Sequence, residues 1–195
     1  NKDTLNIDEN LLEDNISKKT KAIIPVDFRG HPASLGQIHE ISKKKGIKII
    51  EDASHSLGST YKYKGRKYNC GENVHSDFST FSFHPVKHIT TGEGGVITTN
   101  SKHLFDKLKL YAKHGIDRNS KMFSIKKRIG SWKYDMFSLG YNYRLTNFQS
   151  ALGISQLKKL PAFIKRRRNI VNFYNENLKN LEFLQTPYES KNVKS

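Results

Sequence analysis

The sequence has a single cysteine and no long apolar run. Cys70 is the one cysteine among 195 residues, which excludes an internal disulfide and a zinc site built from cysteines alone. No stretch of about 18 apolar residues occurs, so the sequence predicts no membrane-spanning helix. The first ten residues, NKDTLNIDEN, lack the apolar core of a signal peptide. We therefore expect a cytoplasmic protein.

Several motifs of common chemistries are also missing. The stretch GEGG (92–95) does not have the spacing of a Walker loop or of a Rossmann fingerprint. No GxSxG nucleophile elbow is present. The eight histidines show no HExxH or similar metal-ligand pattern. The sequence thus gives no reason to expect a metal site.

Acidic residues are few compared with basic ones, 18 against 34, and the net charge is +16. The basic residues are spread along the chain, with the densest blocks at 126–133 (KKRIGSWK) and 165–168 (KRRR). Solvated surface lysines explain such a spread best, and an anionic small substrate is the next interpretation. A nucleic-acid-binding module is a third, with KRRRNIVNFY (165–174) as its one candidate segment. We expect no nucleic-acid partner.

The hydrophobic pattern predicts an α/β fold. Residues 21–28 and 47–50 are short β-rich apolar runs, and residues 34–46 between them have apolar positions at helical spacing. A strand, a helix and a strand within about 30 residues form a βαβ unit, whose two strands are parallel. Asp52 follows the second strand, where ligands of open α/β sheets bind.

The rest of the chain continues this pattern. We expect a hairpin at 61–73, strands at 77–83 and 94–100, a helix at 101–113, an irregular basic stretch at 116–140 and a helix at 146–160. Pro161 is expected to begin a second helix.

Four polar residues lie at or after the predicted strand ends: Asp52, His55, Ser82 and Lys87. Each alone has an ordinary explanation, as a helix cap, a core histidine, a structural serine or a solvated lysine. Together they suit pyridoxal phosphate. A lysine amine forms a Schiff base with an aldehyde, and an aspartate keeps the pyridine nitrogen of this cofactor protonated. A serine hydroxyl suits its phosphate, and the nearby glycines allow a tight backbone turn.

Four stretches carry a resemblance to a known family: IIEDASHSLGS, FSFHPVKHITTGEGGVITTN, YAKHGI and GYNYRLTNFQSALGISQLKKL. They resemble the DegT/StrS family of nucleotide-sugar aminotransferases, which are fold type I pyridoxal-phosphate enzymes. The resemblance runs from about Thr4 to about Asn177. It implies a mostly parallel central sheet flanked by helices. Residues 1–160 would form an incomplete large domain, and residues 161–195 a linker helix and the start of a small C-terminal domain.

The resemblance also implies roles for individual residues. Lys87 would be the catalytic lysine that bonds to pyridoxal phosphate and then moves the proton. Asp52 would pair with the pyridine nitrogen, His55 would lie beside the ring, and Ser82 would bind the phosphate.

Three later residues complete the implied site. Asn142 would reach the cofactor phosphate of a neighbouring subunit in a homodimer with shared active sites. Arg144, near the same interface, and Tyr134 would contact the substrate.

The implied reaction moves an amino group from an amino acid, expected to be L-glutamate, to C4 of a UDP-linked 4-keto-6-deoxy amino sugar. Residues 131–147 and HPVKHITTGEGG look most like the pseudaminic-acid branch of the family, which serves lipopolysaccharide and flagellin glycosylation. An enzyme of the bacillosamine or perosamine type is an alternative. Family members are longer at both ends, so an inactive truncated relic is another. A shortened chain would leave an apolar face of the sheet uncovered.

Overall fold

The computed structural model describes residues 1–117 and 134–195. They form two compact units, one of Asn1–Asn100 with Asn147–Ser195 and the other of Ser101–Thr146. Trp132 and the predicted basic block 126–133 lie outside the described residues.

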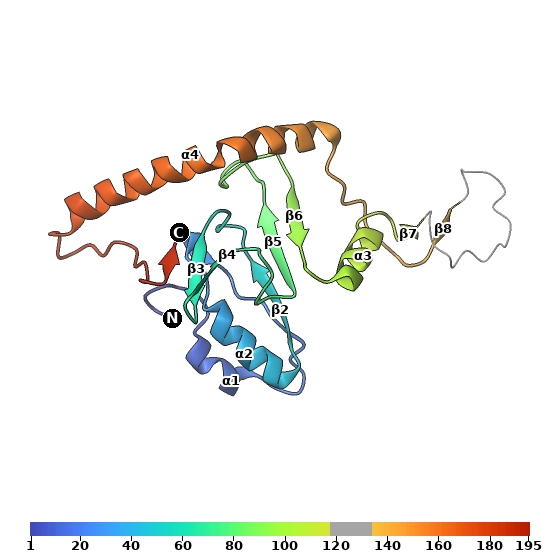
Figure 1. Cartoon of the computed structure of the whole chain (residues 1–195), viewed down its shortest axis with the longest axis horizontal. Coiled ribbons are helices and arrows are strands. Elements are labelled where there is room, and N and C mark those ends of the chain that lie inside the picture. The colour runs from blue at the N-terminus through green and yellow to red at the C-terminus, as the bar shows by residue number, and fades with distance from the viewer. Residues whose placement is uncertain (118–133) are drawn as a thin grey trace. The chain divides into compact units, whose positions relative to one another are not determined.

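The first unit is built on a four-stranded sheet in the order β1-β2-β5-β6. The strands are β1 (Ala22–Ile23), β2 (Lys48–Asp52), β5 (Phe78–Ser82) and β6 (Gly95–Thr98). β2 is parallel to both β1 and β5, whereas β6 is antiparallel to β5. Figure 1 shows β2 and β5 pointing the same way and β6 the opposite way. The expected mostly parallel sheet and the expected βαβ unit are therefore confirmed.

Short helices precede and connect the first strands: η1 (Glu9–Leu11), α1 (Leu12–Asn15), η2 (Phe28–Gly30) and α2 (Leu35–Lys45). Asp8 caps η1, because its Oδ1 accepts from the Asn10 N–H at 3.0 Å. Gly46 closes α2 at φ 66°, a left-handed conformation that a glycine adopts without strain. Leu35 and Ile38 of α2 pack with Ile49 of β2 in the larger core cluster.

The predicted hairpin is formed by β3 (Thr60–Tyr63) and β4 (Arg66–Asn69). Lys64 and Gly65 make its turn, both with positive φ, at 46° and 77°. Near the C-terminus, β9 (Val193–Lys194) adds to the other edge of β3. Residues from the beginning, middle and end of the chain therefore meet in this unit.

One continuous helix, α4 (Asn147–Leu178), replaces the two helices expected on either side of Pro161. That expectation is wrong, because a proline inside a helix removes one hydrogen bond but has a helical φ. Packing before and after the proline holds the helix in place. Leu160 packs against the smaller core cluster, and the Ile164 side chain lies beside Gly58. Among the described residues, no helix is both long and apolar enough to span a membrane.

The second unit contains α3 (Lys102–Tyr111), β7 (Ile116–Asp117) and β8 (Asp135–Met136). Ser101 caps α3, since its Oγ accepts from the Leu104 N–H at 3.4 Å. β7 and β8 pair antiparallel. The N–H of Tyr141 also donates to the carbonyl of Tyr111 at 2.7 Å, which ties the end of α3 to the segment after β8.

One face of the four-stranded sheet carries exposed apolar residues, as far as the described part of the chain shows. Val26, Asp52, Thr80 and Ile97 are partners across the strands and so form one row on this face. The side chains at the two ends of the row are well exposed, Val26 at 39 % and Ile97 at 47 %. Asp52 and Thr80 between them are half-buried. The expectation of an uncovered apolar face stays a prediction.

Candidate functional site

Asp52 and Ser82 lie at the carboxyl ends of two neighbouring parallel strands. Asp52 is paired with Thr80, and Ser82 follows Thr80 by two residues, so both side chains are on the same sheet face. Strand spacings place their Cα atoms about 8 Å apart. The Asp52 carboxylate accepts from the Ser54 N–H at 3.1 Å. Turns rather than a helix follow Asp52, so it is not a helix cap.

Lys87 lies in the loop that connects β5 to β6. The loop folds back on the end of β5, because the N–H of Thr91 donates to the Phe83 carbonyl at 3.0 Å. A turn in which the Lys87 N–H donates to the His84 carbonyl at 2.9 Å holds Lys87 itself. Gly92 has φ 81°, so a glycine is needed there, as the sequence suggested. Lys87 is half-buried.

His88 of this loop and His55 each have a buried ring nitrogen without a partner in the described part of the chain. The Nδ1 atoms of His55 and His88 form no hydrogen bond to the described residues. Burial, then the charges of Arg167, His55 and Lys87, lower the pKa of His88 to about 4. These charges reach His88 from three different segments of the chain. A buried nitrogen without a partner is costly, so both rings suit a bound group that supplies the missing hydrogen bond.

The structure thus brings Asp52, Ser82 and the Lys87 loop to one edge of the sheet, with His55 close to the loop. Sequence reasoning did not identify His88, although it follows Lys87 directly.

The other three predicted residues belong to the second unit. Asn142 forms an isolated bridge with Lys113. Arg144 is exposed, and so is Tyr134. Tyr134 immediately precedes β8, and Asn142 and Arg144 follow it. These three residues therefore lie on a different part of the chain from the four residues discussed above. Their predicted roles concern a neighbouring subunit or a substrate and stay predictions.

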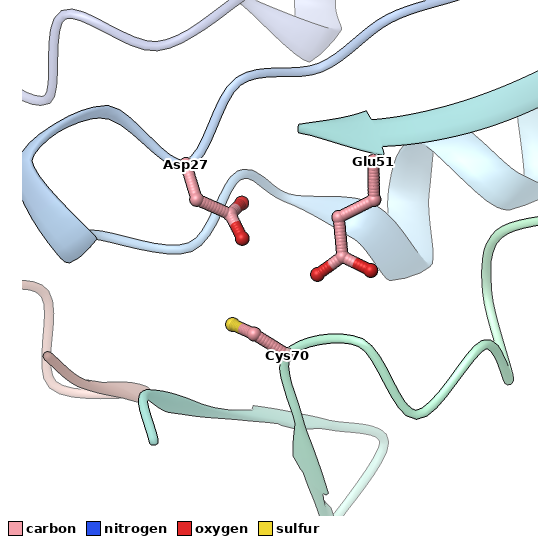
Figure 2. A group of neighbouring side chains, drawn as sticks. All are labelled: Asp27, Glu51 and Cys70. Atoms are coloured by element: carbon pink, nitrogen blue, oxygen red, sulfur yellow. The ribbon is translucent and has the colours of Figure 1, made fainter. Parts of the chain in front are cut away.

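A second group of polar side chains is buried on the sheet face opposite to that of Asp52. Oxygen atoms of Asp27 and Glu51 and the sulfur of Cys70 all lie within 4.8 Å of one another. Asp27 is 0 %, Glu51 1 % and Cys70 7 % exposed. Figure 2 shows the three side chains pointing toward one another, with Asp27 after β1, Glu51 on β2 and Cys70 after β4.

Burial decides the protonation of this group. It raises the pKa of Asp27 to about 8, with the charge of Glu51 as the next cause. The pKa values of Glu51 and Cys70 are also raised, mainly by burial. Two carboxyl groups this close and this deeply buried do not both ionise, so the pair keeps a proton at neutral pH.

Protein donors satisfy the carboxyl oxygens of the pair. The Asp27 oxygens accept from the Ala33 N–H at 2.8 Å and the Ser56 hydroxyl at 2.6 Å. Those of Glu51 accept from the Gly71 N–H and the Ser79 hydroxyl. Such a set of donors fits a structural carboxyl pair. The sequence contains one signal for it, because Glu51 follows Ile49 by two residues and so lies with it on the covered face of β2.

Comparisons with known proteins agree with this geometry. Residues 1–195 match the DegT/DnrJ/EryC1/StrS aminotransferase family. The chain is 44 % identical to the UDP-4-amino-4,6-dideoxy-N-acetyl-beta-L-altrosamine transaminase of Campylobacter jejuni, over 95 % of this chain and 44 % of that protein. It is 38 % identical to the GDP-perosamine synthase of Escherichia coli O157:H7, over 93 % of this chain and 44 % of the relative.

Solved structures give the same picture. Helicobacter pylori PseC, described as an aminotransferase of pseudoaminic acid biosynthesis, matches with a TM-score of 0.77 and 37 % identity, over 91 % of this chain and 43 % of that one. The PLP form of Spr1654 from Streptococcus pneumoniae, described as a sugar aminotransferase, matches with a TM-score of 0.81 and 29 % identity, over 99 % and 50 %. The expected fold class is confirmed. The chain spans about half the length of the relatives it matches.

Proposed function

Because this chain belongs to the DegT/DnrJ/EryC1/StrS aminotransferase family, we propose that it is part of a pyridoxal-phosphate-dependent nucleotide-sugar aminotransferase. The observation that carries this proposal is the arrangement at one sheet edge. A half-buried lysine lies in the loop after β5, and a carboxylate and a hydroxyl lie on one face at the ends of β2 and β5.

The residues at this edge fit the cofactor. Lys87 would hold pyridoxal phosphate covalently, Asp52 would keep a proton on its ring nitrogen, and Ser82 would bind its phosphate. The buried Nδ1 of His55, which has no partner among the described residues, suits a position beside the ring. When bound, the cofactor supplies the electron sink for breaking bonds at the amino-acid α-carbon. Once the amino donor has displaced it from the cofactor, the free Lys87 amine would take and return the proton that moves during amino transfer.

The substrate that we propose is a UDP-linked 4-keto-6-deoxy amino sugar, aminated at C4, with L-glutamate as the amino donor. The similarity to the Campylobacter jejuni transaminase favours this sugar. The similarity to GDP-perosamine synthase favours a GDP-linked keto-sugar as the second candidate. The two are distinguished by assaying both nucleotide sugars with one enzyme preparation, since a sugar site rejects the wrong base or ring substituent.

The remaining predictions belong to the same proposal. The functional form would be a cytoplasmic homodimer in which Asn142 completes the cofactor site of the neighbouring subunit and Arg144 and Tyr134 contact the substrate. Residues 1–160 would be part of the large domain, and residues 161–195 would be the linker helix and the beginning of the small domain.

The test is to trap the cofactor on the 195-residue chain. The chain is mixed with pyridoxal phosphate, reduced with borohydride, digested and examined by mass spectrometry. A single adduct on Lys87, absent from a Lys87→Arg variant, supports the proposal. Adducts scattered over exposed lysines such as Lys45 would show that this chain has no formed cofactor site. That result would favour the inactive relic.

A further inference from the structure

The loop that carries Lys87 lies antiparallel along α4. At the far end of the loop, the Gln149 side-chain amide donates to the Glu93 carbonyl at 2.8 Å. Four residues later in the helix, Gly153 is buried against Thr91, whose Cγ2 would be 3.0 Å from an added Cβ. Later residues of the loop therefore contact earlier residues of α4, as in two segments that run antiparallel.

The middle of the helix packs on the same region. Leu160 contacts the core cluster that contains Ile89. Ile164, one turn further, lies against Gly58 in the segment after β2, where an added Cβ would be 2.3 Å from its Cδ1. α4 therefore covers both segments that present the candidate cofactor residues.

The next turn of α4 carries Arg167, whose side chain contacts the backbone at Lys87. The two terminal nitrogens of Arg167 donate to consecutive carbonyls, Nη2 to Lys87 at 3.4 Å and Nη1 to His88 at 3.5 Å. Both contacts are long for hydrogen bonds. A guanidinium is a rigid planar fork, so its two donors act together on consecutive peptide units. A lysine at this position would offer one point charge and no fork.

We propose that Arg167 is a positioning residue for Lys87: its guanidinium holds the backbone of Lys87 and His88 against α4. This inference rests on the proposed function for its consequence, because a fixed backbone aims the Lys87 amine at one place. The clamp itself involves only residues of this chain.

The charge of Arg167 has a second, separable effect. It is the first cause after burial that lowers the pKa of His88 to about 4, followed by the charges of His55 and Lys87. His88 is therefore neutral at pH 7. Loss of the positive charge at position 167 should raise the pKa of His88 toward its ordinary value, because the charged imidazole is then repelled less.

The first test measures hydrogen exchange of residues 84–93 in the chain without cofactor. We expect Arg167→Met to speed exchange in this segment about fivefold to tenfold, because the loop opens more often once its clamp is lost. Arg166→Met is the matched control, since Arg166 is the exposed neighbouring residue on the same helix. Equal exchange rates in the two variants would overturn the proposal.

A second variant separates the fork from the charge. Arg167→Lys keeps the charge, so the pKa of His88 measured by NMR should stay low while exchange of the loop is still faster. Arg167→Met should raise the pKa of His88 and speed exchange together, and Arg166→Met should change neither. The His88 signal is assigned by its loss in His88→Gln. If Arg167→Met does not fold, Arg167→Lys alone decides, and normal exchange in that variant refutes the fork.

These measurements are independent of cofactor binding. If the exchange rates confirm the clamp but Lys87 forms no pyridoxal-phosphate adduct, the proposed function is rejected and the clamp stands. If Lys87 forms the adduct with the same yield in Arg167→Met, and exchange is also unchanged, the clamp is rejected and the proposed function stands.

Discussion

Replacing Glu51 by glutamine should weaken the dependence of stability on pH. The substitution removes the second carboxyl group beside Asp27 and keeps the shape of the side chain. The glutamine carbonyl still accepts from the Gly71 N–H, and its amide still faces the Ser79 hydroxyl, which accepts as well as it donates. We therefore expect the variant to fold, with the charge between positions 27 and 51 as the main difference.

The sign follows from proton binding. In the unfolded chain Asp27 loses its proton near pH 3.8, whereas in the folded chain its pKa is about 8. The folded state thus holds the extra proton between these values, and its stability is lost as the pH rises toward 8. A group with that folded pKa lowers the free energy of unfolding by roughly 1 to 2 kcal/mol between pH ~6.5 and ~8. Without the Glu51 charge the pKa of Asp27 would be lower, so this loss over the same pH range would be smaller.

The assay is urea unfolding followed by circular dichroism at several values between pH ~6.5 and ~8. Lower pH is avoided, because burial also lowers the pKa values of His75 and His88 from 6.5, and this acts in the opposite direction. Glu13→Gln, an exposed glutamate of α1, is the control and should follow the unchanged chain. Equal slopes for Glu51→Gln and the unchanged chain would refute a shared proton between Asp27 and Glu51.

Three further predictions concern the candidate site and the second unit. In a protein of the relatives' length that contains this sequence, Lys87→Ala should abolish amino transfer while circular dichroism stays unchanged; turnover near the original rate would remove Lys87 from its role. In the same protein, Asp52→Asn should slow the proton-transfer half-reaction about a hundredfold, measured by stopped-flow absorbance, because the ring nitrogen loses its charged partner. Gly115→Ala should cost about 2 kcal/mol or more in urea unfolding, since its Cβ would lie 1.6 Å from the Ser138 carbonyl oxygen at φ +68°. Gly65→Ala, with φ +77° and no atom nearby, should cost less, and equal costs would contradict this reasoning.

The sequence pattern was sufficient to predict the sheet and to place the candidate residues at the ends of its strands. Apolar runs and capping residues are local signals, and the βαβ unit follows from three of them in order. The positions of Asp52 and Ser82 follow as well, because parallel strands end at the same edge. The lysine loop was recognisable from its glycines, and two of them, Gly92 and Gly94, have positive φ.

Contacts between distant segments were not predictable in this way. Arg167 is 80 residues from Lys87, and in the sequence it is one of three consecutive arginines. Only the helix phase, set by the packing of Leu160, decides which arginine reaches the loop. Pro161 was misread for a related reason, because the packing that keeps α4 continuous across it comes from residues far away in the sequence.

Because Cys70 is buried, the rate at which a thiol reagent labels it reports how often this part of the chain opens. The chain has one thiol, and that thiol is buried with a pKa raised well above its ordinary value. A thiol reagent in the solvent therefore reacts only during the moments when the hairpin end parts from the sheet. This chain has no other thiol, so the labelling rate measures the frequency of opening. A ligand that lowers the labelling rate has bound to the closed form.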